Sequence, residues 1–132
     1  METTQRYLLK KEDRLKSQKA IETLFKQGLS FSHFPFRVLW LKPNIGEGLQ
    51  VGFSASTKNF KKATDRNRIK RLMREAYRLQ KNDLQFRLLS KQKSLHLFII
   101  FIGKDLPDYE VIFEKTSAVL KRITKLVDEN IE

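Results

Sequence analysis

The stretch KATDRNRIKRLMREAYRLQ, residues 62–80, carries the strongest local structural signal in this 132-residue chain. Apolar residues recur in it at steps of three and four, which is the spacing of a helix that buries one side. These residues are Ile69, Leu72, Met73, Ala76 and Leu79. We therefore predict a long helix here, docked on the core of the protein through that apolar stripe.

The chain before this stretch predicts a short helix followed by strands. Ser17 can cap a helix over residues 17–26, and Gly28 ends it. Residues 34–41 (FPFRVLWL) and 49–54 (LQVGFS) are rich in aromatic and β-branched side chains, which are typical of strands. The KPNIGEG segment between them is typical of a turn, so we expect these two strands to pair as an antiparallel hairpin.

The chain after it predicts one more strand and a last helix. A polar turn at Asn82-Asp83 precedes residues 84–89, whose secondary structure the pattern leaves open. Residues 95–102 form an apolar run of eight. A transmembrane helix needs about 20 such residues, so we expect a buried strand instead. Asp108, directly after Pro107, can cap the last helix.

These elements predict an α+β fold with two or three strands before the long helix, and with three strands there the order is α-β-β-β-α-β-α. In it a small mixed sheet of about four strands is packed with three helices. The length suits a single domain over residues 1–132, with frayed ends at about 1–10 and 128–132.

Composition favours a polyanionic partner. Lys and Arg number 27 against 15 Asp and Glu, which gives a formal net charge of +12. Such an excess favours nucleic acid first and an anionic membrane surface second. The chain has no cysteine, which excludes disulfides and thiolate chemistry. Since no segment is apolar enough for export or for crossing a membrane, we expect a cytoplasmic protein without a membrane partner.

Much of this charge lies on one side of the central helix. Residues 58–81 contain ten basic side chains and two acidic ones, a net of +8. At 100° per residue, the side opposite the apolar stripe carries Asn67, Lys70, Arg71, Arg74 and Arg78. Two arginines, Arg66 and Arg68, fall on the flanks, and three lysines, Lys58, Lys61 and Lys62, extend the patch beyond the helix start. Guanidinium groups match phosphate oxygens in pairs, so we predict binding to a polyanion.

A solvated helix face normally alternates charges and pairs them, and this one offers one obvious pair, Arg71 with Glu75.

The run RNRIKRLMREAYR, residues 66–78, closely resembles the signature helix of the bacterial ribonuclease P protein subunit. Upstream, Gly52-Phe53-Ser54 and the segment Arg14-Leu15-Lys16 also resemble that family. The chain departs from the family at Thr57 and Phe60, which stand where it commonly has a lysine and a glycine, and at Leu95 and His96, where it often has an acidic residue.

The resemblance implies a protein that assembles with a catalytic RNA, in a complex that removes the 5′ leader of precursor tRNA. The RNA would carry the active site and bind the Mg²⁺ ions, so we expect no catalytic residue and no metal ligand in the protein. The fold would be like the second domain of ribosomal protein S5, with a left-handed βαβ crossover. The implied contacts to the catalytic RNA are Lys58, Lys61, Lys62, Arg66, Asn67, Arg68, Lys70, Arg71, Arg74 and Arg78.

A leader-binding surface beside the first helix is a second implication. Ile21 and Phe25 match family positions that border it. Phe36 and Trp40 share one face of their strand, where they would stack on bases if that face is open and form core if it is not. Arg37 lies on the opposite face of that strand, at the binding surface or at its rim.

Three other functions are compatible with parts of this pattern. A structural binder of ribosomal or other folded RNA, with no part in catalysis, suits the composition and the basic helix equally well. A DNA-binding regulator would need a helix-turn-helix neighbour, whereas strands flank this helix, so we expect no DNA partner. A membrane-surface protein would need large apolar residues beside the basic ones on an exposed face.

Overall fold

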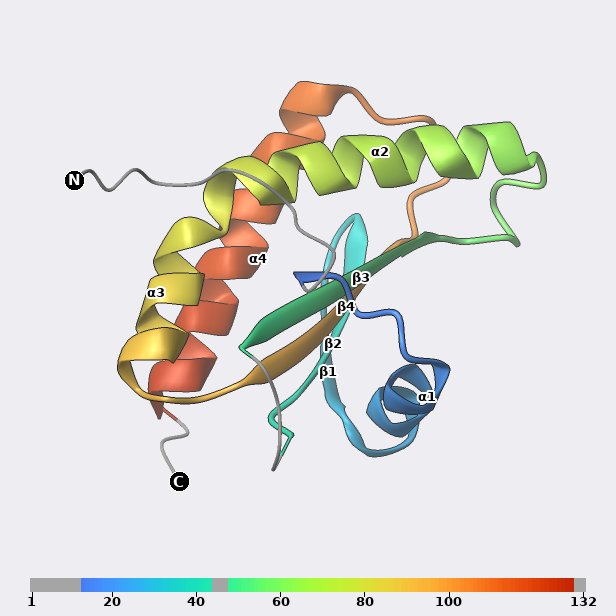
Figure 1. Ribbon diagram of the computed structural model, residues 1–132. Helices are drawn as coiled ribbons and strands as arrows, with labels where there is room; N and C mark the ends of the chain where they lie inside the picture. Colours follow the sequence, from blue (N-terminus) through green and yellow to red (C-terminus); the bar gives the residue numbers. More distant parts are fainter. Residues whose placement is uncertain (1–12, 44–47, 130–132) are drawn as a thin grey trace.

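The computed structural model describes residues 13–43 and 48–129, which form one mixed sheet with helices on both of its faces (Figure 1). The expected fraying of residues 1–10 and 130–132 lies outside the described residues. In chain order the elements are α1 (Gln18–Gln27), β1 (Leu29–His33), β2 (Phe36–Leu41), β3 (Leu49–Ala55), α2 (Ala63–Gln80), α3 (Asn82–Ser90), β4 (Leu95–Phe101) and α4 (Tyr109–Glu129).

The sheet has the order β1-β2-β4-β3, and its pairing corrects one prediction. Strand β2 pairs antiparallel with β1 and β4, whereas β3 pairs parallel with β4. The expected hairpin between β2 and β3 is therefore wrong. The hairpin joins β1 to β2 through Phe34 and Pro35, and α2 and α3 return the chain to the start of β4. The left-handedness of this β3-α2-α3-β4 crossover stays a prediction.

The helices confirm most of the expected boundaries. Helix α1 begins after Ser17, whose Oγ accepts a hydrogen bond from the Ala20 N–H at 3.2 Å, and it ends at Gly28. Helix α2 begins at Ala63. In α4, the expected fraying from residue 128 is not seen, because the helix runs to Glu129 and the Asp128 carboxylate pairs with the Lys91 ammonium at 2.5 Å.

The described chain has four helices where the sequence predicted three. The additional helix, α3, covers the segment whose structure the pattern left open and includes the expected turn at Asn82-Asp83. Its Leu84 and Leu88 are 1% exposed, so packing within the domain stabilises it more than a continuous apolar stripe does.

The two faces of the sheet carry cores of different size. Helices α2, α3 and α4 cover the first face, where the main core includes Phe36, Val38 and Trp40 of β2. Helix α1 lies alone on the opposite face (Figure 1), where a small core joins Leu24 to Leu39 and Leu15. No helix among the described residues combines the length and apolar character needed to cross a membrane.

Candidate nucleic-acid interface

Helix α2 turns its apolar side inward and its basic side outward. Ile69, Met73, Ala76 and Tyr77 are fully buried against the sheet and α4. Leu79, expected in the buried stripe, is instead 37% exposed, because Tyr77 occupies the inward position at that turn and packs edge-to-face on Phe53. The exposed side carries Asn67, Arg68 and Arg71, with Lys70 and Arg74 half-buried beside them.

The first arginine of the motif has a structural task. The Nη1 atom of Arg66 donates hydrogen bonds to the backbone oxygens of Phe60 at 2.8 Å and Lys61 at 2.9 Å. These bonds tie the start of α2 to the loop before it, and the side chain is half-buried. At least one end of the guanidinium thus holds the loop, and an RNA contact through the rest of the Arg66 side chain stays a prediction.

The last arginine of the predicted set is partly neutralised. Arg78 and Glu75 form a two-point ion pair, with Nη2–Oε2 at 2.6 Å and Nε–Oε1 at 3.1 Å. This pair lowers the pKa of Glu75 and raises the pKa of Arg78. The expected pair between Arg71 and Glu75 is wrong, because the carboxylate lies against the arginine three residues on. Arg71 therefore forms no ion pair with any residue that the structure describes.

Mutual repulsion marks the middle of the basic face. Burial lowers the pKa of Arg74, and the neighbouring charges of Arg14 and Arg71 lower it further. Within the described residues, Arg68, Lys70, Arg71 and Arg74 form no ion pair. Like charges that gather without an acidic partner favour a bound anion.

Arg14 also belongs to this surface, because its charge acts on Arg74. It pairs with Val51 as an isolated bridge, and the adjacent Leu15 N–H donates to the Val51 oxygen at 2.9 Å. Because β3 is the edge strand next to α2, this bridge brings Arg14 close to the basic face. The pairing is tertiary, so no local pattern could have predicted it.

The loop before α2 presents three lysines to solvent. Lys58, Lys61 and Lys62 are all exposed. Asn59 anchors this loop, because its Nδ2 donates to the backbone oxygens of Ile102 at 3.1 Å and Gly103 at 3.2 Å. The lysines thus extend the basic face of α2 from a loop that is hydrogen-bonded both to the segment after β4 and to Arg66 of α2.

The sheet face beside α1 offers a different surface, with aromatic and apolar groups. Phe25 is 49% exposed and packs edge-to-face on Phe98, with ring centroids 5.3 Å apart. Arg37 and Ile100 lie next to each other in register on this face, and Arg37 is exposed. Gly52 makes room for the Phe98 ring, since a Cβ atom there would lie 2.6 Å from it.

The five residues expected to bind a leader divide between the two faces of the sheet. Ile21, Phe25 and Arg37 lie on the α1 side, as the expectation requires. Phe36 and Trp40 lie in the main core, 1% and 5% exposed, so the expectation that they stack on bases is wrong. The sequence pattern missed Phe98 and Ile100, whose alternation in β4 places them on the open side.

A groove of about 430 Å³ continues this face past the C-terminal half of α1. It is lined by Ala20, Thr23, Gln27, Leu41, Lys42, Pro43 and His96. Burial lowers the pKa of His96, which favours its neutral form at pH 7. The groove therefore combines polar donors and acceptors with one lysine.

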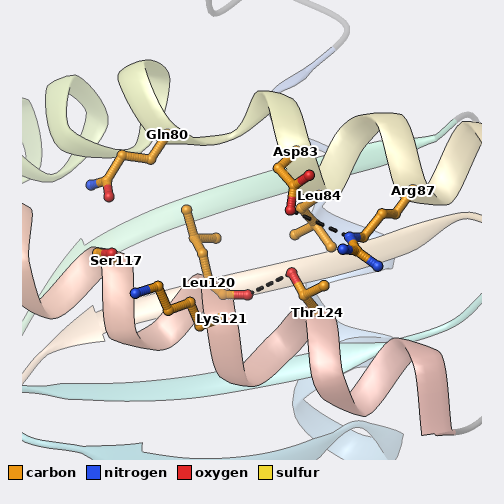
Figure 2. A pocket seen from close by; sticks show the side chains of 8 residues that line it. All are labelled: Gln80, Asp83, Leu84, Arg87, Ser117, Leu120, Lys121 and Thr124. Carbon is orange, nitrogen blue, oxygen red and sulfur yellow. Dashed lines mark hydrogen bonds and ion pairs between the residues drawn. The ribbon is translucent and has the colours of Figure 1, made fainter.

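A second groove, of about 320 Å³, lies between α3 and α4 (Figure 2). Its charges are largely satisfied, because Arg87 pairs with Asp83 at 3.3 Å and with Asp128 at 3.2 Å. The Thr124 hydroxyl donates to the Leu120 oxygen at 2.8 Å. In the parts of the chain that the structure describes, no group of three or more His, Asp or Glu side chains is placed to hold a metal ion.

Comparisons with known proteins agree with this geometry. The family model described as Ribonuclease P matches residues 9–124. A ribonuclease P protein component from Porphyromonas gingivalis is 33% identical over 120 residues, covering 87% of this chain and 85% of the relative. The RNase P protein from Thermotoga maritima superposes with a TM-score of 0.64 at 28% identity, covering 83% of this chain and 96% of that one. The Staphylococcus aureus RNase P protein has the same fold, with a TM-score of 0.67 at 23% identity and coverage of 84% and 94%.

Proposed function

The chain belongs to the ribonuclease P protein-component family, and on that premise we propose that it binds a catalytic RNA through α2 and the 5′ leader of precursor tRNA beside α1. The observation that carries the proposal is the basic face of α2, where Arg68, Lys70 and Arg71 form no ion pair within the described chain. Cations held on a helix, without partners of their own, favour phosphate contacts.

The contact with the catalytic RNA uses the exposed part of α2 and the loop before it. Arg68 and Arg71 can each bind two oxygens of one phosphate through the guanidinium group. The three lysines before α2 add positive charge without this bidentate geometry; they are Lys58, Lys61 and Lys62. Arg66 positions this loop through its bonds to Phe60 and Lys61. Each neutralised phosphate releases counterions, so the affinity falls steeply as salt increases.

The contact with the leader uses the sheet face beside α1. An unpaired base stacks on the exposed ring of Phe25, which Phe98 supports from the sheet side. Arg37 lies on the same face and supplies charge for the leader backbone. A surface of aromatic rings with a flanking cation binds single strands with little dependence on their sequence.

Chemistry is assigned to the RNA in this proposal. In this proposal the catalytic RNA would hold the Mg²⁺ ions, which would supply activated water for hydrolysis of the phosphodiester bond between the 5′ leader and the tRNA. The protein contributes cations near the catalytic RNA and contacts that exist only for tRNA that still carries its leader. Its effect is to favour precursor over mature tRNA, and the ribonuclease activity belongs to the complex.

The test is precursor-tRNA cleavage by the cognate catalytic RNA at low Mg²⁺, with and without the purified protein. We expect the protein to stimulate removal of the 5′ leader and to cleave nothing by itself. Tight RNA binding without stimulation would instead favour a structural RNA-binding protein, and cleavage by the protein alone would contradict the assignment of chemistry to the RNA.

A further inference from the structure

An exposed aromatic ring at the turn between β1 and β2 belongs to neither surface described above. Phe34 is 70% exposed, more than any other large hydrophobic side chain in the described residues. The turn lies at the end of the sheet where β3 and β4 also finish, since Phe36 is in register with Phe101, and Phe101 with Ala55. The chain leaves Ala55 for the basic loop, so this ring lies at the same end of the molecule as the start of α2.

A pocket of about 300 Å³ opens beside this ring. It lies between the turn, the segment that follows β4 and the first turns of α4. Its apolar lining includes Pro35, Leu106, Pro107 and Val111. Leu106 and Val111 are 46% and 42% exposed, so the protein leaves an apolar surface uncovered here. The pocket with the ring of Phe34 is called the turn pocket below.

Hydrogen bonds connect the turn pocket to the basic loop. The Ile102 N–H donates to the Pro35 oxygen at 2.8 Å. Asn59, within the basic loop, donates from Nδ2 to the oxygens of Ile102 at 3.1 Å and Gly103 at 3.2 Å. Because Pro35 and Gly103 both line the pocket, the pocket adjoins the loop that carries the three lysines.

The charged lining suits a nucleotide better than an apolar peptide. Lys104 and Lys115 line the pocket and can bind a phosphate, whereas Asp105 and Asp108 can accept hydrogen bonds from the amino group of a base. The exposed ring of Phe34 offers a stacking surface in the same pocket. A purely apolar partner would leave these four charges without a use.

We propose that the turn pocket binds one unpaired nucleotide, with its base stacked on Phe34 and its phosphate held by Lys104 or Lys115. This inference rests on the proposed function, in which the chain binds RNA. The nucleotide belongs either to the catalytic RNA or to precursor tRNA, and separate binding measurements distinguish the two sources.

The first experiment compares affinities of Phe34→Ala and wild-type protein. The dissociation constant is measured for the protein with the catalytic RNA and for the assembled complex with precursor tRNA. Loss of one stacked base is expected to weaken binding roughly five- to a hundredfold in the arm that supplies the nucleotide. The matched control is Phe86→Ala, because Phe86 is 68% exposed but lies on α3, and its affinities should equal those of the wild type.

The second experiment uses an indole as a reporter of stacking. The chain has one tryptophan, Trp40, so the double variant Phe34→Trp, Trp40→Phe carries a single indole, at the turn. Titration with a ten-nucleotide oligoadenylate should quench the indole fluorescence. The quenching should occur over the same concentrations at which fluorescence anisotropy of the labelled oligonucleotide reports binding. Quenching supports the turn pocket even if the alanine variant folds poorly.

The outcomes separate this inference from the proposed function. RNA binding that is weakened by Arg68→Ala but unchanged by Phe34→Ala, with no indole quenching, would overturn the turn pocket and leave the proposed function standing. A failure of the wild-type protein to bind either RNA would overturn both. Equal weakening by Phe34→Ala and Phe86→Ala would show a general effect of surface apolar residues and would also overturn the turn pocket.

Discussion

The two faces of the sheet are made by the same strands, yet they treat aromatic side chains in opposite ways. On the face beneath α2, α3 and α4, Phe36 and Trp40 are 1% and 5% exposed. On the α1 face, one helix of ten residues covers only part of the sheet, and Phe25 stays 49% exposed. The first face supplies stability and displays its cations on the outside of a helix, whereas the second presents the sheet itself.

The face toward which a strand residue points, more than its residue type, therefore decides which aromatic side chains can contact a ligand. Side chains alternate along β2, so Arg37 and Leu39 point away from the main core while Phe36, Val38 and Trp40 point into it.

The largest expected effect is the loss of protein stability when a side chain is removed from the main core beneath α2, α3 and α4. Phe36→Ala should lower the free energy of unfolding by about 3–5 kcal/mol, because it removes a fully buried ring and leaves a cavity. Phe25→Ala, on the other face, should cost about 1 kcal/mol, since half of its ring is already in water. Urea denaturation of both variants measures these values. Equal losses would erase the distinction between the faces.

The charged outside of α2 should dominate binding to the catalytic RNA. Arg68→Ala and Arg71→Ala should each weaken it by about 1.5–3 kcal/mol, the contribution of a hydrogen bond to a charged group. Each should also reduce the slope of log K against log salt by about 1. The matched control is the double variant Glu75→Ala, Arg78→Ala, because it removes the ion pair, whose Nη2–Oε2 distance is 2.6 Å, without changing the net charge. An effect of this double variant as large as that of Arg68→Ala would contradict this distinction.

Removing the space that Gly52 provides should disturb the α1 face alone. In Gly52→Ala the new Cβ would lie 2.6 Å from the Phe98 ring, which must then shift away from its contact with Phe25. We expect the affinity of the assembled complex for precursor tRNA to fall by about 1 kcal/mol, roughly fivefold. Affinity for the catalytic RNA should not change, and a parallel loss there would mean that the two surfaces are coupled.

The smallest expected effect is a dependence of stability on pH at His96. Burial lowers the pKa of this histidine, so the folded protein binds its proton less readily than the unfolded chain does. The contribution is present above pH of about 6.5 and is lost as the pH falls below that value through the lower folded-state pKa. Unfolding free energies between pH 7 and 5 should decline less in His96→Gln than in the wild type.

Much of α2 and α4 could be predicted, because their apolar residues repeat with the period of a helix. Helix α3 could not. Its apolar residues include buried Leu84 and Leu88 but also Phe86 and Leu89, which are 68% and 65% exposed, so no single stripe marks its inner side.

The strand pairing and the detail of the interface depended on tertiary structure. The residues of β3 contain no local signal that predicts pairing with β4, because α2 and α3 separate the two strands in the sequence. The same limit applies to Arg66, whose bonds to Phe60 and Lys61 arise from the path of the loop before α2. The basic face itself was evident from spacing alone.

The most direct test of the proposal that the α1 face binds the leader and α2 binds the catalytic RNA compares Phe25→Ala with Arg68→Ala. For each reconstituted complex, the ratio of dissociation constants for mature and precursor tRNA reports leader recognition, and the protein's affinity for the catalytic RNA is measured beside it. We predict that Phe25→Ala reduces the ratio and leaves the affinity for the catalytic RNA unchanged. Arg68→Ala should leave the ratio unchanged and weaken the affinity for the catalytic RNA. A ratio unchanged by Phe25→Ala, or reduced equally by both variants, would contradict the account.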